Sequence, residues 1–111
     1  MSGMFQLEHY LTPDGTDIIG EWLDGLTDHQ ATARLAARFV RLALGNFGDC
    51  KALSHGVWEL RIDWGPGYRV YYAQAGAELL ILLGGGDKRK QKSDITRAVN
   101  YWQDWQRRSK Q

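Results

Sequence analysis

Cysteine is nearly absent from this sequence, which carries a single one, Cys50, among 111 residues. An internal disulfide therefore cannot form, which agrees with the reducing environment of a cytoplasm. Long hydrophobic runs are missing as well, because the longest apolar stretch, residues 79–83, is far too short to span a bilayer. The chain also opens without a signal-peptide pattern. We therefore expect a cytoplasmic protein without membrane association.

Histidine is also scarce, and His9, His29 and His55 are scattered along the chain. Together with one cysteine they give no metal-ligand spacing, so we expect no metal site and no cofactor. His55 lies in a glycine-flanked loop and could act as an acid or base, although a surface position is the simpler interpretation. Residues 84–86 are three glycines without the Walker spacing of a phosphate loop. We interpret them as a turn between a strand and a helix.

The residues that are present predict one folded domain covering residues 1–111. Hydrophobic residues make up 43% of the chain and charged residues 24%, which is typical of a globular protein. Residues 1–3 precede a second methionine, Met4, and could be a cloning remnant to which we assign no function.

The net charge of +1 conceals an uneven distribution along the chain. Residues 1–33 carry six carboxylates and no Lys or Arg, whereas residues 34–77 and 78–111 have balances of +3 and +4. This asymmetry indicates an anionic partner for the C-terminal half. On charge alone, an ordinary solvated surface is the simpler interpretation.

Hydrophobic spacing predicts a short first strand near residues 5–10 and two helices after it. The first helix begins near residue 18 with Thr16 or Asp17 as its N-cap, and the second begins after Asp28 and ends at Gly45. The short loop between them predicts an antiparallel helical hairpin. We interpret residues 46–56 as loop.

From residue 57 onward the hydrophobic period changes from 3.6 to 2, which predicts three strands joined by tight turns. They cover residues 57–63, 68–73 and 79–83, and a last helix follows from about 91 to 108, with Trp102 and Trp105 on its buried side. The predicted fold class is α+β: a short N-terminal strand, a two-helix hairpin, a three-stranded antiparallel meander and a C-terminal helix.

Strand alternation predicts a cluster of charged side chains on one face of the meander. If the apolar sets face the helices, Arg61 and Arg69 share the open face of the sheet, and a run of cations follows the third strand. Two arginines beside lysines are typical of a phosphodiester site. The alternative is a cross-strand ladder in which carboxylates neutralise the arginines. The residues involved are Glu59, Arg61, Asp63, Arg69, Tyr71, Lys88, Arg89, Lys90 and Lys92.

The run Gly56–Tyr72, GVWELRIDWGPGYRVYY, closely resembles the signature of RelE/ParE-superfamily type II toxins. It is most similar to the phage Gp49-like, HigB-type "addiction module killer" branch. Two further segments agree, LGNFGD at residues 44–49 and LLGGGDK at 82–88 with Gln91 after it. The resemblance covers nearly the whole chain and implies a RelE-like fold.

The resemblance also implies an activity, a partner and site residues. It implies a toxin that cleaves mRNA in the ribosomal A site by attack of a ribose 2′-hydroxyl, without metal. The partner would be a cognate antitoxin, expected to be a helix-turn-helix DNA-binding protein, through which alone the toxin would meet operator DNA. Arg69 matches the phosphate-stabilising arginine, and Lys88 or Arg89 matches the basic residue assigned to leaving-group protonation or phosphate contact. For RNA binding we expect Arg89, Lys90, Lys92 and Tyr71.

The proton-transfer half of the expected site departs from RelE, which carries two lysines where this chain has Glu59 and Arg61. An arginine effectively cannot lose its proton, so Arg61 is a better phosphate clamp than a general base. Glu59 is therefore expected either to be the base or to orient Arg61. The base-stacking tyrosine of RelE has no counterpart among residues 93–95.

Two other functions agree with the same fold. The first is a ParE-like toxin that inhibits DNA gyrase without cutting RNA. The second is a degraded toxin that mainly binds its antitoxin. A shared fold does not decide between them, but the cluster of Arg61, Arg69 and Lys88 favours the nuclease.

Overall fold

The computed structural model describes residues 4–110. Residues 1–3, the possible cloning remnant, lie outside the described residues. The elements follow one another as β1 (Gln6–His9), α1 (Ile18–Asp24), α2 (His29–Ala43), β2 (Cys50–Ala52), β3 (Val57–Ile62), β4 (Tyr68–Gln74), β5 (Leu79–Asp87), the 3-10 helix η1 (Lys88–Lys90) and α3 (Gln91–Ser109).

The five strands form one sheet in the order β1-β5-β4-β3-β2. The predicted antiparallel meander is confirmed in β3, β4 and β5. The sheet as a whole is mixed, because β1 pairs with β5 in parallel. The interpretation of residues 46–56 as loop was wrong for β2, which pairs with residues 58–60 of β3. Three residues are too few for alternation to be visible, so this strand depends on its tertiary partner.

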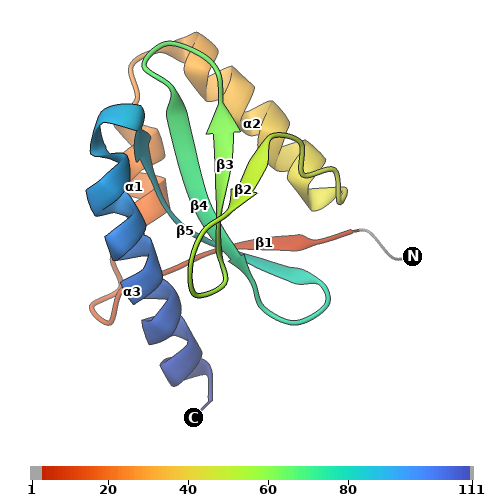
Figure 1. The fold of residues 1–111 in the computed structure, drawn as a ribbon, viewed down its shortest axis with the longest axis vertical. Helices are drawn as coiled ribbons and strands as arrows, with labels where there is room; N and C mark the ends of the chain where they lie inside the picture. Colours follow the sequence, from red (N-terminus) through yellow and green to blue (C-terminus); the bar gives the residue numbers. More distant parts are fainter. Residues whose placement is uncertain (1–3, 111) are drawn as a thin grey trace.

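Both predicted helix starts are confirmed by side-chain caps. The carboxylate of Asp17 accepts a hydrogen bond from the Gly20 amide, and that of Asp28 accepts from the amides of Gln30 and Ala31. The chain turns between α1 and α2 through residues 25–28, and both helices pack on the sheet (Figure 1). These caps fix where α2 begins over the sheet.

Both faces of the sheet are covered (Figure 1). Helices α1 and α2 pack on one face, where Leu35 and Leu42 meet the strand residues Leu60 and Val70. Helix α3 packs Ala98 and Trp102 on the other face. We had predicted that this second face would be open. The charged cluster instead lies on the part of that face beside the first turn of α3.

The glycines of residues 84–86 belong to β5, so their interpretation as a turn was wrong. Glycine is needed at two of these strand positions, because a Cβ there would collide with a neighbouring side chain. At Gly85 it would lie 2.3 Å from the Trp22 ring, and at Gly86 it would lie 2.0 Å from the Asp94 carboxylate. The glycines therefore admit α1 on one face and α3 on the other.

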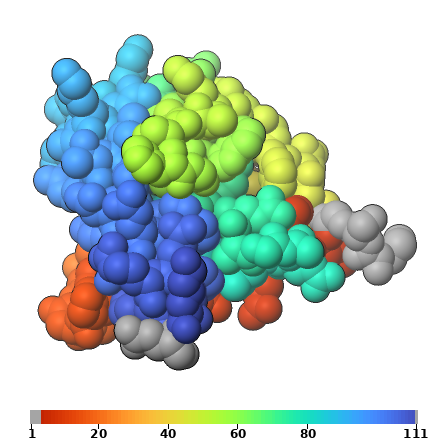
Figure 2. Space-filling view, turned by 60° about the horizontal axis from the view of Figure 1, so that its bottom comes forward, coloured from red at the N-terminus to blue at the C-terminus, as the bar shows by residue number. Residues whose placement is uncertain are grey.

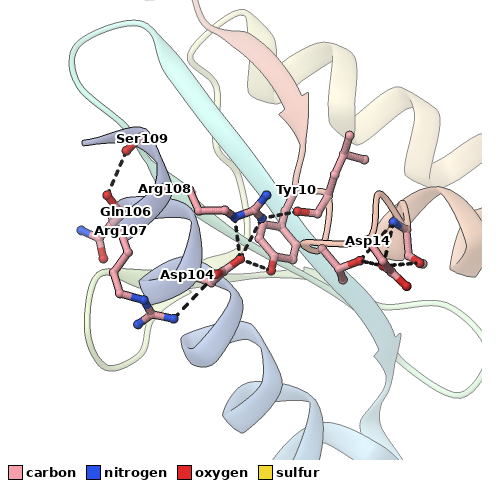
Figure 3. A network of polar contacts seen from close by, with 10 residues as sticks. Tyr10, Asp14, Asp104, Gln106, Arg107, Arg108 and Ser109 are labelled. Atoms are coloured by element: carbon pink, nitrogen blue, oxygen red, sulfur yellow. Dashed lines mark hydrogen bonds and ion pairs between the residues drawn. The ribbon is translucent and has the colours of Figure 1, made fainter. Parts of the chain in front are cut away.

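The C-terminal helix is fastened to the first strand segment. The Tyr10 hydroxyl donates to Asp104 at 2.6 Å, and Arg108 donates to the same carboxylate and to the Leu11 carbonyl (Figure 3). The segment after β1, in orange, lies beside the blue C-terminal helix in Figure 2. Within residues 4–110 no helix combines the length and apolar character needed to cross a membrane.

Candidate functional site

The structure brings Arg61, Arg69 and Lys88 together around one pocket of about 380 Å³. Arg61 and Arg69 are direct cross-strand partners on β3 and β4, which confirms that they share a face. Lys88 enters from the start of η1, just after β5. The rest of the lining comes from Asp49, Asp63 and the turn of residues 65–67.

Glu59 lies beneath the two arginines and is completely buried. Its Oε1 atom is 3.0 Å from Nε of Arg61 and 3.8 Å from Nε of Arg69. Its other oxygen accepts a hydrogen bond of 2.6 Å from the Gln91 side chain of α3. Both oxygens of Glu59 therefore already have partners. We infer that this carboxylate orients the arginines and does not itself act on a ligand in the pocket.

The arginine side chains differ in how much of them solvent can reach. The Arg61 side chain is 34% exposed and the Arg69 side chain 12%. Arg69 also donates to the carbonyl of Tyr68 at 3.1 Å. Arg69 is therefore the more buried of the two cations, whereas Arg61 makes the hydrogen bond to Glu59 and presents more of its surface to a ligand.

The formal charges of the pocket-lining residues and of Glu59 cancel. Three cations, Arg61, Arg69 and Lys88, face three carboxylates, since Asp49 and Asp63 line the pocket and Glu59 lies under it. The alternative prediction, in which carboxylates neutralise the arginines, is therefore confirmed for Glu59, which forms ion pairs with both of them. Asp63, the other carboxylate of that ladder, is exposed at the pocket wall.

Helix α2 holds two walls of the pocket through Arg38. Its guanidinium donates to the carbonyl of Arg61 at 2.6 Å and to those of Phe47 and Asp49 at 3.2 and 3.4 Å. A single side chain thus ties α2 to β3 and to the loop before β2. Sequence reasoning did not foresee this role for Arg38.

The turn after β3 is also anchored on α2. The indole of Trp64 donates to the Asp28 carboxylate at 3.0 Å, and the Arg34 guanidinium lies 3.9 Å from the centre of the Trp64 ring. At the other end of this turn, a Cβ at Gly67 would lie 3.4 Å from Nη1 of Arg69 and 3.5 Å from Cβ of Lys88. A Cβ at this position would thus be in ordinary van der Waals contact with two of the pocket's cations.

The other predicted cations do not join this pocket. Arg89 is paired with Asp87 at 3.0 Å, and its side chain is 80% exposed. Together with Lys90 and Lys92 it lines a separate depression on the outer side of η1 and the first turn of α3. An RNA strand would have to pass over η1 to contact both sets.

Tyr71 is not placed where we predicted. It is only 1% exposed beneath α3, so its ring cannot stack on a base. Burial raises the pKa of its hydroxyl, and the nearby charges of Glu59 and Asp94 raise that pKa further. The apolar partners Ala98 and Trp102 of α3 explain the burial.

Gln91 and Asp49 are the site residues that sequence reasoning did not assign. Gln91 stands in the first turn of α3 and Asp49 before β2, so neither shares an element with the charged strand residues. Only the family pattern, which includes both positions, gave a signal for them. Among residues 4–110 no three His, Cys, Asp or Glu side chains gather to hold a metal ion.

Comparison with known proteins identifies the family of the chain. Residues 21–100 match the model of the family described as phage derived protein Gp49-like. An uncharacterized protein of Haemophilus influenzae is 51% identical over 77 residues, which cover 69% of this chain and 78% of the relative. Residues 21–100, matched by the family model, include every residue that lines the pocket. The chain therefore belongs to the Gp49-like family of toxin-like proteins, which is associated with toxin–antitoxin pairs.

Proposed function

We propose that this protein is the toxin of a type II toxin–antitoxin pair, of the HigB type, and that it cleaves mRNA on the ribosome. The observation that carries the proposal is the convergence of Arg61, Arg69 and Lys88 on one pocket with a buried carboxylate holding the arginines. Arginine and lysine together bind and stabilise a phosphate whose negative charge increases during reaction. We propose a cytoplasmic location and a cognate antitoxin as the inhibitor.

The proposed reaction joins the ribose 2′-oxygen to the adjacent phosphorus and breaks the bond from phosphorus to the 5′-oxygen. A base takes the 2′-hydroxyl proton, and an acid gives a proton to the departing 5′-oxygen. The products are a 2′,3′-cyclic phosphate and a 5′-hydroxyl, with no net gain or loss of protons. No metal takes part in this step.

In this scheme Arg69 and Arg61 bind the non-bridging phosphate oxygens, and Lys88 protonates the leaving oxygen. Glu59 is a positioning residue, because its carboxylate is buried and already accepts from Arg61 and Gln91. The base is then a carboxylate of the pocket wall, and Asp49 and Asp63 are the two that line it. Separate Asp49→Asn and Asp63→Asn variants identify which one acts.

The test is cleavage of a defined mRNA on translating ribosomes by the purified chain, with the 5′ ends of the products mapped. Arg69→Ala and Lys88→Ala should each reduce the cleavage rate at least ~100-fold, the usual scale for one electrostatic or acid–base group. Arg97→Ala is the matched control, because Arg97 pairs with Asp94 at 3.0 Å outside the pocket.

Three outcomes contradict the proposal. Intact mRNA with accumulating DNA breaks in the presence of gyrase would support the gyrase inhibitor. Binding to the antitoxin without growth arrest or cleavage would support the degraded toxin. Cleavage that survives both Arg69→Ala and Lys88→Ala would show that the reaction takes place elsewhere on the molecule.

A further inference from the structure

Helix α2 has two apolar faces, and only one of them is covered. With about 3.6 residues per turn, Ala31, Leu35 and Leu42 lie on the face that packs on the sheet, and all three are buried. On the opposite face, where a surface helix normally carries polar residues, the residues are Ala33, Ala36, Ala37, Val40 and Leu44, all of them exposed.

The exposed face continues onto the start of the chain's first strand segment. The Phe5 amide donates to the Ala43 carbonyl at 2.7 Å, which places Met4 beside the end of α2. In Figure 2 the yellow end of α2 lies close to the red β1 segment. Met4, Val40 and Leu44 are 59%, 61% and 57% exposed. Three of the five large hydrophobic side chains exposed among residues 4–110 therefore gather here.

We propose that this outer face of α2, made of Ala33, Ala36, Ala37, Val40, Leu44 and Met4, is a docking surface for an amphipathic helix with acidic flanks. The stripe from residue 33 to residue 44 is about 16 Å long and narrow, as one helix facing another requires. Ala33, Ala36 and Ala37, toward the N-terminal end of the stripe, are small enough to let two helix axes approach closely.

The acidic character of the partner follows from the charges of α2. The helix carries three arginines and neither aspartate nor glutamate. Arg34 and Arg41 lie at the edge of the apolar stripe, and both are exposed. A partner helix with glutamates beside its apolar stripe would meet these cations, whereas a basic helix would be repelled.

The same charges argue against a second copy of this chain as the occupant. A two-fold contact with the two α2 helices antiparallel would bring the like-charged arginine edges together on one side. A single apolar stripe flanked by cations on one side suits a different partner. The surface does not overlap the pocket, so its occupancy can be measured without any assay of RNA cleavage.

The experiment uses two synthetic helical peptides with the same leucine stripe, one carrying glutamate and the other lysine at the flanking positions. Binding of each labelled peptide to the full chain is followed by fluorescence anisotropy. We expect the glutamate peptide to bind at least ~10-fold more tightly, a difference of about 1.4 kcal/mol. Val40→Glu together with Leu44→Glu should abolish binding, and Arg41→Glu should reduce or reverse the preference.

Leu11→Glu is the matched control, since Leu11 is also an exposed hydrophobic residue, at 46%, but lies outside α2. It should leave peptide binding unchanged, and circular dichroism confirms that each variant is folded. Equal binding of both peptides, no binding of either, or binding that survives the Val40 and Leu44 changes would overturn the proposal. Light scattering that shows a dimer of the chain, converted to monomer by Val40→Glu, would assign the surface to a second copy.

Discussion

Glu59 is the residue on which the arrangement of the pocket depends, since it holds both arginines from below while α3 holds it through Gln91. The alternation of β3 correctly placed Glu59 on the face of Arg61, but alternation says nothing about coverage by a distant helix. Its burial, and with it the choice between a base and a positioning residue, therefore required the position of α3. The same limitation explains why the burial of Tyr71 beneath α3 was not predicted.

Replacing Glu59 with Gln should weaken the fold and strengthen anion binding. The two arginines would lose their buried counter-charge, and we expect the free energy of unfolding to fall by about 2–3 kcal/mol, less than for a fully buried pair because Arg61 is partly exposed. The pocket would gain one net positive charge and should bind phosphate more tightly. Urea unfolding and phosphate titration measure the two effects. An unchanged stability would mean that the ion pairs are not formed in solution.

Gly67→Ala should damage the pocket beyond its cost in backbone strain. The residue has a φ of +84° and lines the pocket, and its Cβ would lie in ordinary van der Waals contact with Arg69 and Lys88, where it occupies space at the mouth of the pocket. Gly76→Ala is the matched control, because Gly76 has a φ of +80° with no atom within 4 Å of its Cβ. Both variants should lose about 1–2 kcal/mol of stability, but only Gly67→Ala should weaken phosphate binding. Equal phosphate affinities would mean that the mouth of the pocket is not crowded.

At the scale of elements, long periodic segments were predictable and short or glycine-rich ones were not. The strands β3 and β4 and the helix α3 carry enough alternating or helical apolar residues to define themselves. The end of β5 contains three glycines and has no side-chain pattern, so its strand conformation depends on Trp22 and Asp94 packing from either side. Arg61 and Arg69 could be paired from the sequence because both lie on well-defined strands.

The two packed glycines of β5 should differ in their tolerance of alanine. At Gly85 the new methyl group would enter the ring of Trp22, which is rigid and held by its own packing against Tyr68. At Gly86 it would meet the end of the Asp94 side chain, which can rotate away. We expect a loss of about 3 kcal/mol for Gly85→Ala and about 1 kcal/mol for Gly86→Ala, measured by urea unfolding. The reverse order would contradict this packing.

On the scale of the whole molecule, contacts between distant parts of the sequence join the segment after β1 to the C-terminal helix. Tyr10 lies just after β1, and its hydroxyl donates to Asp104 near the end of α3. Burial, followed by the hydrogen bond and charge of Asp104, raises the pKa of Tyr10 to about 12. No local pattern in the sequence indicates such a pairing, since each partner looks like an ordinary surface residue of its own segment.

This junction should make the fold sensitive to alkali. An unfolded tyrosine loses its proton near pH 10, whereas folded Tyr10 keeps it to about 12. The contribution is therefore complete below pH 10 and is lost as the pH rises from 10 to 12. Tyr10→Phe should lower the urea midpoint at neutral pH and flatten its decline above pH 10. Parallel declines for the two proteins would show that Tyr10 does not titrate with unfolding.

The cancelled charges of the pocket have a consequence for how the protein meets RNA. Beyond a Debye length of about 8 Å, the three cations and three carboxylates of the pocket offset one another, and Arg38 behind its wall adds one positive charge. Long-range attraction to RNA then comes mainly from Arg89, Lys90 and Lys92 outside the pocket. Neutralising these three should therefore reduce the salt dependence of RNA binding more than neutralising Arg61 and Arg69 does. The two arginines act on a phosphate that the outer cations have already brought within contact distance.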